Sequence, residues 1–378
     1  MSVIFSEAHE DLRRTVRDFL RDTSPPAEVR RLMETPAGYD TALWRRMADE
    51  LGLQGLAVPE EYGGAGAGPV ELGIVMEEMG RSLFCAPFLS TAVLAVFALT
   101  DSDDGIAQAM LLPGIAVGEI IATLAVAESA GSWDLGSVAA TAELRDGRWL
   151  LSGTKMFVTD GLAADVILVA ARTGEGLGLF AVRGTASGVR RTALATLDQT
   201  RRQARIDLAE AEGVPVGGPG DGTPALERVL DRAVAVLAAE QVGGARQVLE
   251  TAAGYARTRV QFGRPIGSFQ AVKHKLADML VEVESAGSAA YRALEAAAGD
   301  VPPDDLPEIA SIAKAYCSDA YAHVAAESIQ IHGGIGFTWE HSAHLYLKRA
   351  RSDRQLLGDP GYHLARLARL LEQLYAAA

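Results

Sequence analysis

Apolar residues recur with the period of an α-helix in two parts of the chain, before about residue 115 and again after about residue 223. In the first part, the pattern predicts a helix capped by Ser6 and ended by Pro25 and Pro26, followed by helices over 41–51, 68–80 and 88–99. In the second part, it predicts long helices over 223–257, 269–298, 307–331 and 339–350, and a last helix ending at Tyr375. Long helices in succession are typical of an antiparallel bundle.

The stretch between these two parts has the alternating pattern of β-strands. Residues 137–144 alternate, with Val138, Ala140, Ala142 and Leu144 on one side, and short apolar runs at 123–127, 165–171 and 178–182 predict buried strands. The dipeptide Asp146-Gly147 separates two strand-like runs, which is a strong signal for a hairpin. The chain is therefore expected to be an α+β protein, with an N-terminal helical domain over 1–118, a middle β domain over 119–222 and a C-terminal helical bundle over 223–378.

The charge and cysteine content restrict the possible functions. Lys and Arg number 35 against 49 Asp and Glu, so the net charge of −14 argues against a nucleic-acid binder. Every stretch long enough to cross a membrane contains charged residues, so we expect no transmembrane helix. The acidic N-terminal residues are unlike a secretory or mitochondrial targeting signal. The chain has two cysteines, Cys85 and Cys317, so we expect packed thiols and a reducing, cytoplasmic location.

Several familiar chemical motifs are absent from the sequence. The glycine-rich stretch 63–68 does not have the spacing of a dinucleotide-binding loop, and neither a P-loop nor a G-x-S-x-G elbow occurs. His341 and His344 are three residues apart, but no third ligand is evident, so we expect no metal site.

Two segments in the C-terminal part remain as candidate binding sites. Residues 257–267 place three arginines, an aromatic residue and a tight turn between two long helices, which suits a pyrophosphate group. Basic residues that complement a helix dipole are the alternative interpretation of that segment. Residues 330–337 end a helix with three glycines, which either admit a ligand close to the backbone or form a simple helix cap.

Four segments of this chain resemble motifs of the acyl-CoA dehydrogenase family, and they occur in the family's order. Residues 259–270 resemble its R-x-x-F-G-x-x-(I/L)-x-x-x-Q element, and residues 330–336 resemble Q-x-x-G-G-x-G. Residues 127–132 resemble the flavin loop T-E-P-x-x-G-S, shortened by one residue and with Ser129 in place of the proline. Residues 155–161 resemble K-x-(W/F)-(I/V)-(T/S)-N-G. The resemblance implies the family's fold, in which a β-barrel domain lies between two helical domains.

The resemblance also implies a bound FAD and the residues that hold it. Beside the flavin and its phosphates it places Ala127, Ser132, Phe157 and Thr159. At the adenosine end of an FAD held mainly by a neighbouring subunit it places Arg259, Phe262, Gln270, Gln330, Gly333 and Gly334. Ala127 stands where the family usually has a hydroxyl residue, so one hydrogen bond near flavin N5 is expected to be missing.

The family's reaction needs a carboxylate that removes the α-proton of an acyl-CoA while hydride leaves the β-carbon for flavin N5. The family keeps this glutamate at one of two places, which correspond by a gapless count to Ala233 and Leu357. Neither residue is acidic. The acidic candidates near these places are Asp231, Glu240 and Glu340, although a salt bridge suits Glu340 better.

A bacterial branch of the family offers an explanation for the missing base. Residues 330–350 and 198–202 are most similar to a branch that includes sterol side-chain acyl-CoA dehydrogenases built as α2β2 heterotetramers. In that branch one subunit type carries the glutamate and the other completes the FAD site without it.

These resemblances lead to three alternatives for function. The chain is expected to be an FAD-dependent acyl-CoA dehydrogenase of lipid or sterol metabolism, alone or as the base-less subunit of a hetero-oligomer. A purely structural subunit that completes an FAD site is the second alternative, and a biosynthetic relative acting on a carrier-protein thioester is the third. The expected partners are an acyl-CoA, an electron-transfer flavoprotein as electron acceptor, and the other subunits of a homo- or hetero-tetramer.

Overall fold

The computed structural model describes residues 6–220 and 222–377, which form two compact units. The first, called here the helical unit, contains the chain up to Arg31, Pro69–Phe84 and the chain from Val234 onward. The second, called the sheet unit, contains Leu32–Gly68 and Cys85–Ala233. Each unit thus collects segments that are far apart in the sequence, and the domain boundaries at 118 and 222 remain predictions.

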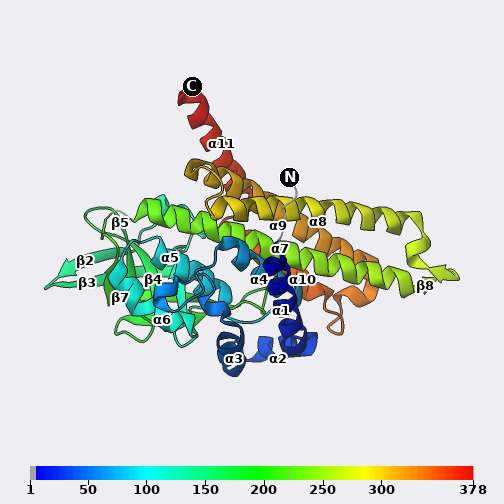
Figure 1. Ribbon diagram of the computed structural model, residues 1–378, viewed down its shortest axis with the longest axis horizontal. Helices are drawn as coiled ribbons and strands as arrows, with labels where there is room; N and C mark the ends of the chain where they lie inside the picture. The colour runs from blue at the N-terminus through cyan, green and yellow to red at the C-terminus, as the bar shows by residue number, and fades with distance from the viewer. Residues whose placement is uncertain (1–5, 221, 378) are drawn as a thin grey trace. The chain divides into compact units, whose positions relative to one another are not determined.

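The helical unit is built on long helices that pack side by side (Figure 1). Its helices are α1 (Glu7–Thr23), α4 (Pro69–Ser82), most of α7 (Thr223–Thr258), α8 (Gln270–Ala297), α9 (Leu306–His332), α10 (Ala343–Gln355) and α11 (Pro360–Ala377). Helix α9 contacts α8, α10 and α11, while α4 contacts α1 and α8. The expected helical bundle is therefore present. Between α7 and α8 lies a short hairpin of β8 (Val260–Gln261) and β9 (Arg264–Pro265).

Two glycines allow α4 and α7 to approach each other at backbone distance. A Cβ atom added to Gly243 would lie 1.8 Å from the carbonyl oxygen of Glu77, and one added to Gly80 would lie 2.1 Å from that of Glu240. No larger residue fits at either position without separating the helices. This close contact holds the two acidic residues Glu77 and Glu78, which are buried on α4, beside α7.

Local sequence signals account for several helix ends. Ser6 caps α1 by accepting a hydrogen bond from the backbone N–H of His9 at 3.2 Å, as predicted. Pro26 begins α2 (Pro26–Glu34), because proline is tolerated in the first turn of a helix. The helix predicted to begin at Trp339 begins instead at Ala343, because the preceding residues continue the irregular turn that follows α9.

The sheet unit combines short helices with a sheet that closes on itself. Its helical segments are α3 (Thr41–Leu51), the π-helical turn η3 (Leu89–Ala95) with α5 (Val96–Thr100), and α6 (Gly105–Ala116). Its strands are β1 (Ala122–Ala125), β2 (Thr141–Arg145), β3 (Arg148–Thr159), β4 (Val166–Arg172), β5 (Leu177–Arg183), β6 (Val189–Ala193) and β7 (Gln203–Val216).

The strand order is β1-β4-β2-β3-β7-β5, and β5 also pairs with β4, so five strands form a closed ring. Strand β6 pairs with β7 outside this ring. The expected β-barrel is therefore present, and Figure 1 shows where its strands lie.

The hairpin predicted at Asp146-Gly147 joins β2 to β3. Both residues have positive φ, 50° and 75°, as a type I′ turn requires, and Arg145 pairs with Arg148 across the turn. The alternation predicted from residue 137 becomes a strand only at Thr141, because Leu135–Ser137 forms a 3₁₀ turn. Of the four side chains placed on one side of this alternation, Val138, Ala140 and Ala142 are buried and Leu144 is 58% exposed.

Candidate functional site

The loop after β1 is fixed to β3 by a buried lysine. The ammonium group of Lys155 donates to the carbonyl oxygen of Val126 at 3.1 Å and to a carboxylate oxygen of Glu128 at 2.7 Å. Glu128 also accepts hydrogen bonds from the backbone N–H groups of Ala139 and Ala140. Burial alone would raise the pKa of Glu128, but the lysine and the two N–H groups outweigh it and lower that pKa. The loop over 127–132 therefore has a defined shape.

The four residues expected beside a flavin lie on this loop and on β3. Ala127 is buried, and its carbonyl oxygen accepts a hydrogen bond from the N–H of Met156 at 2.8 Å. The hydroxyl of Ser132 accepts from the N–H of Asp134 at 3.1 Å, and Thr159 is 3% exposed.

Phe157 occupies a bulge in β3 with an unusual backbone. Its φ is +56°, and the register with β7 shifts between Lys155 and Val158. The ring stays 38% exposed, although the strand on either side is largely covered. A Cβ atom on Gly131 would lie 3.6 Å from the Phe157 ring, so the ring lies against the loop over 127–132. The bulge therefore presents an aromatic face at the surface of the sheet unit.

The connection between α7 and α8, with the first residue of α8, carries three of the residues expected at the adenosine end. Arg259, Phe262 and Gln270 are all exposed, and Phe262 is 89% exposed. The Phe262 ring meets Phe269 edge-on, with 6.0 Å between ring centroids, and the carbonyl oxygen of Arg259 accepts from the N–H of Ile266. Arg259 is thus an exposed residue next to a structured turn at the end of α7.

The end of α9 carries the other three residues of that group. Gln330, Gly333 and Gly334 are exposed, and a Cβ atom on either glycine would meet nothing within 4 Å. The ring centroids of Tyr255 and His332 lie 4.6 Å apart. Tyr255 precedes Arg259 by one helical turn, and His332 directly precedes Gly333. The structure therefore brings the two candidate segments to the same end of the helical unit, beside open space.

Neither position of the expected catalytic base carries an acid. Ala233 is fully buried in α7. Leu357 is 2% exposed, has a φ of +59°, and its carbonyl oxygen accepts a hydrogen bond from Nε2 of His363 at 2.9 Å. Both side chains are hydrocarbon and cannot accept a proton.

The three acidic candidates occupy different environments. Glu240 forms an ion pair with Arg349, and each of the two side chains is 2% exposed. Asp231 is buried and interacts with neighbouring groups. Glu340 is exposed, and a hydrogen bond from the hydroxyl of Thr338 lowers its pKa. A carboxylate bound to a guanidinium, as in Glu240, must give up that partner before it can accept a proton.

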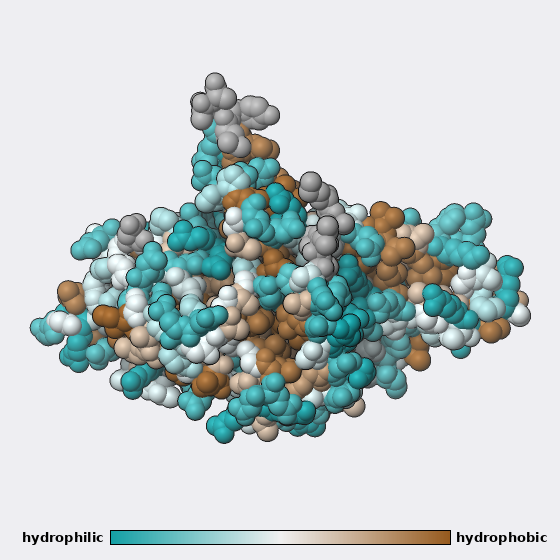
Figure 2. Space-filling view, viewed as in Figure 1, coloured by the Kyte–Doolittle hydropathy of each residue, from teal (hydrophilic) through white to brown (hydrophobic). Residues whose placement is uncertain are grey.

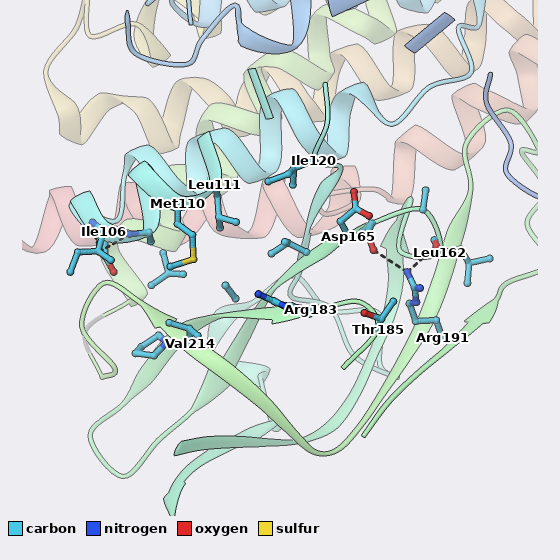
Figure 3. A pocket seen from close by; sticks show the side chains of 18 residues that line it. Ile106, Met110, Leu111, Ile120, Leu162, Asp165, Arg183, Thr185, Arg191 and Val214 are labelled. Atoms are coloured by element: carbon cyan, nitrogen blue, oxygen red, sulfur yellow. Dashed lines mark hydrogen bonds between the residues drawn. The ribbon is translucent and has the colours of Figure 1, made fainter. Parts of the chain in front are cut away.

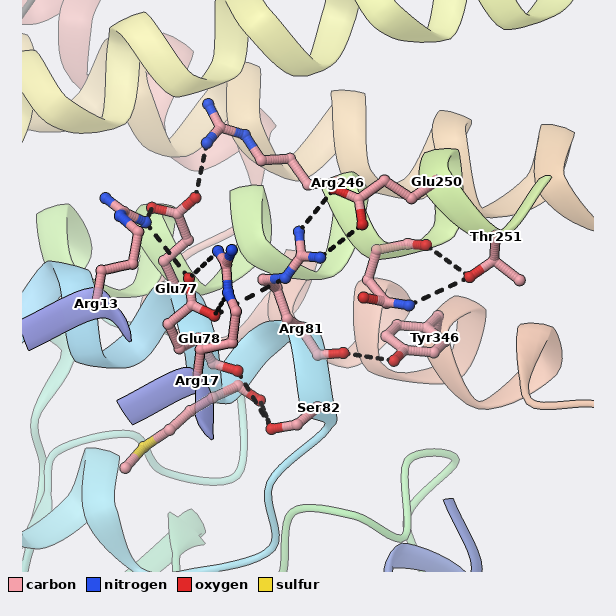
Figure 4. Close-up of polar contacts among 12 residues, drawn as sticks. Arg13, Arg17, Glu77, Glu78, Arg81, Ser82, Arg246, Glu250, Thr251 and Tyr346 are labelled. Carbon is pink, nitrogen blue, oxygen red and sulfur yellow. Dashed lines mark hydrogen bonds and ion pairs between the residues drawn. The ribbon is translucent and has the colours of Figure 1, made fainter. Parts of the chain in front are cut away.

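A second cluster of buried charges connects α1, α4 and α7 (Figure 4). Glu77 and Glu78 are each 1% exposed; Arg13 and Arg246 pair with Glu77 at 2.8 and 2.9 Å, and Arg17 pairs with Glu78 at 2.7 Å. Both buried carboxylates are thus matched by guanidinium groups, which marks the cluster as a structural network.

The sequence interpretation did not assign roles to Lys155 and Glu128, although both lie within quoted motifs. Their opposite charges in two short motifs were the available signal. Over 6–220 and 222–377, no three His, Cys, Asp or Glu side chains are placed to hold a metal ion. In the same part of the chain, no helix is both long and apolar enough to span a membrane.

Comparison with protein families gives three consecutive matches. The model described as "Acyl-CoA dehydrogenase, N-terminal domain" matches residues 6–119, and the corresponding middle domain matches residues 123–204. The C-terminal domain model matches residues 220–371.

Individual proteins are similar over nearly the whole chain. "Acyl-CoA dehydrogenase IpdE2" of Mycobacterium tuberculosis is 38% identical over 96% of each chain. Among solved structures, a variant of the "Tcur3481-Tcur3483 steroid ACAD" superposes with a TM-score of 0.90 at 31% identity, over 98% of this chain and 99% of that one. The ChsE4-ChsE5 complex from Mycobacterium tuberculosis superposes with a TM-score of 0.89 at 30% identity, over the same shares.

Proposed function

We propose, from the premise that this chain belongs to the acyl-CoA dehydrogenase family, that it is the base-less subunit of a hetero-oligomeric enzyme of this class. Members of the family are FAD-dependent oxidoreductases, so the class of enzyme predicted from the sequence is confirmed. The subunit role goes beyond family membership and depends on the residues described above.

The residues of the chain fit a flavin cofactor. The exposed ring of Phe157 offers an apolar face, and the lysine-fixed loop over 127–132 lies beside it. Arg259 offers a guanidinium for a pyrophosphate, and the open space at Gly333 admits a ligand to the backbone. The flavin, when bound, supplies the acceptor for the hydride that leaves the β-carbon of the substrate. Within the chain, Phe157 would pack against that group, and Arg259 and the α9 end would serve a cofactor shared with a neighbouring subunit.

The observation that carries the proposal is the hydrocarbon character of both base positions. Removal of the α-proton of a thioester requires a desolvated carboxylate close to that carbon. Ala233 and Leu357 cannot provide one, and Glu240 is already paired with Arg349. These residues support a base on another subunit, with Asp231 as the acidic candidate of this chain that the experiment below also tests.

Two further observations support assembly with a partner. The names of both similar structures have two components, Tcur3481-Tcur3483 and ChsE4-ChsE5. Apolar side chains also reach the surface of the helical unit, and Figure 2 shows brown surface along α8, where Leu280 and Val281 are 50% and 65% exposed. Apolar surface of this kind is typical of protein–protein contacts.

The description of the Tcur3481-Tcur3483 protein as a steroid enzyme supports an acyl-CoA with a steroid-derived acyl group as the substrate class of this chain. Electron-transfer flavoprotein as the electron acceptor and a tetramer with two kinds of subunit complete the proposal.

The test is co-expression with a glutamate-bearing acyl-CoA dehydrogenase subunit. Three preparations are compared: this chain alone, the pair, and the pair with the partner's glutamate changed to glutamine. We expect flavin absorbance near 450 nm in both pairs, and dye-coupled oxidation of steroid acyl-CoA esters only in the unmodified pair. Robust turnover by this chain alone would refute the base-less role. Full turnover by the glutamine pair would place the base in this chain.

A further inference from the structure

A cavity of about 530 Å³ lies within the sheet unit (Figure 3), and none of the four candidate flavin residues of that unit lines it. It is bounded by α6 on one side and by β5, β6 and β7 on the other. Its volume is within the range of about 300–1,000 Å³ that is usual for small-molecule sites. Family membership assigns no role to this cavity.

Most of the side chains that line the cavity are aliphatic, and several remain accessible. Ile106 and Met110 of α6 are 78% and 61% exposed, and Val214 of β7 is 56% exposed. Leu162, in the loop before β4, is 36% exposed. Large apolar side chains that gather around one cavity form a surface that favours an apolar ligand.

The two arginines of the cavity have no carboxylate partner among the described residues. Arg183 projects from β5 into the space between Met110 and Val214 (Figure 3), and its guanidinium has no hydrogen bond or ion pair with any residue of the described chain. Within the same residues, the guanidinium of Arg191 donates to backbone carbonyl oxygens, those of Leu162 and Ala164 at 2.9 Å and that of Gly161 at 3.4 Å.

The two acidic residues of the lining are occupied by backbone groups. Asp104 caps α6 by accepting from the N–H groups of Ile106 and Ala107, and its second oxygen accepts from the N–H of Gly217 at 3.0 Å. Asp165 accepts from the N–H of Ile121 at 2.9 Å. The cavity thus combines an aliphatic wall with a guanidinium that is available to an anion.

We propose that this cavity binds an apolar molecule with a terminal carboxylate, whose hydrocarbon part lies along α6 and whose carboxylate pairs with Arg183. The aliphatic wall removes the hydrocarbon from water, and the planar guanidinium can bind a carboxylate through two parallel hydrogen bonds. Arg183 is exposed. An uncharged molecule of the same shape would lack the pairing with its guanidinium, so the cavity should bind an acid more tightly than an alcohol.

Decanoate and decanol are suitable probes, because they share the same hydrocarbon chain and differ in charge. Calorimetric titration of the full chain in its FAD-loaded form should give one decanoate site, with decanol binding at least about tenfold more weakly. Arg183→Leu should weaken decanoate at least about tenfold and leave decanol unchanged. Met110→Trp fills the aliphatic part of the cavity and should weaken both probes.

Arg148→Leu is the matched control, because Arg148 is an exposed arginine of β3 outside the cavity. It should leave both affinities unchanged. The proposal is overturned if decanoate does not bind, if it binds no better than decanol, or if neither Arg183→Leu nor Met110→Trp weakens it. The last result would mean that the probe binds elsewhere, for example at the site of the acyl-CoA substrate. None of these outcomes depends on the base-less role.

Discussion

Glu240 of α7 and Arg349 of α10 form an ion pair in the interior of the helical unit, with each side chain only 2% exposed. The two residues are 109 positions apart in the sequence. Charges removed from water to this extent are tolerated when they are paired, because the desolvation of an unpaired charge costs several kcal/mol. Glu240 is therefore committed to holding α7 and α10 together.

The first prediction concerns the stability that depends on this pair. Glu240→Gln should lower the free energy of unfolding by about 3–5 kcal/mol, because it removes one partner of a buried ion pair. Urea denaturation followed by circular dichroism measures the change. Glu50→Gln, in the exposed pair with Arg46, is the control and should have no measurable effect. A Glu240→Gln protein as stable as the parent would contradict a structural role.

The second prediction concerns the cofactor. If Arg259 pairs with the FAD pyrophosphate, Arg259→Ala should weaken FAD binding by roughly 10- to 150-fold, the effect of losing a charge-assisted hydrogen bond. Arg259→Lys should recover only part of this affinity, because the planar fork is lost. Flavin retained after gel filtration is the measurement, and Arg292→Ala, an exposed arginine of α8, is the control. If Arg259→Ala retains as much flavin as the parent, the role of Arg259 is instead to complement the dipole of α7.

The third prediction concerns the missing base. Ala233→Glu should raise the acyl-CoA oxidation of the chain without a partner, since general base catalysis contributes about 10²–10⁴-fold in rate. Ala233→Gln has nearly the same volume and no basic oxygen of comparable strength, so it controls for the disturbance of a buried site. Dye-coupled turnover, normalised to bound flavin, is compared for the two variants. Equal rates would mean that position 233 does not face the reacting carbon.

The fourth prediction uses the buried amine of Lys314, which donates to Ser318 and to the carbonyl oxygen of Asp353, both at 2.9 Å. Burial lowers the pKa of Lys314 to about 7. Between that value and its ordinary pKa the unfolded chain binds a proton that the folded chain does not. The contribution of Lys314 to the free energy of unfolding therefore increases as pH rises above 7, and it is lowest below pH 7.

Lys314→Met should remove this dependence. The unfolding free energy of the parent minus that of Lys314→Met should increase by at most about 1.4 kcal/mol per pH unit between pH 7 and 9. Urea titrations at several pH values give this difference, with Lys275→Met on the exposed part of α8 as the control. A difference that does not vary with pH would show that Lys314 titrates near its ordinary value in the folded state.

Much of the secondary structure is determined by residues close together in the sequence. The helical period placed α7, α8 and α9 to within one or two residues, and Asp146-Gly147 specified its own turn through two positive φ angles. The motifs over 127–132, 155–161, 259–270 and 330–336 likewise identified the family, because each is a short run that can be recognised without its neighbours in space. The hydrocarbon residues at 233 and 357 followed from counting along the chain.

The tertiary structure decided the features that depend on distant residues. The closure of the sheet through β5 and β4, the pairing of Lys155 with Glu128 and of Arg349 with Glu240, and the cavity in front of Arg183 could not be read from the sequence. Helix period and turn type depend on backbone angles and on contacts within a few residues, and those are present in any short segment. The partners in an ion pair and the position of a cavity depend on how whole helices and strands pack against each other. That packing is determined jointly by all the side chains between them.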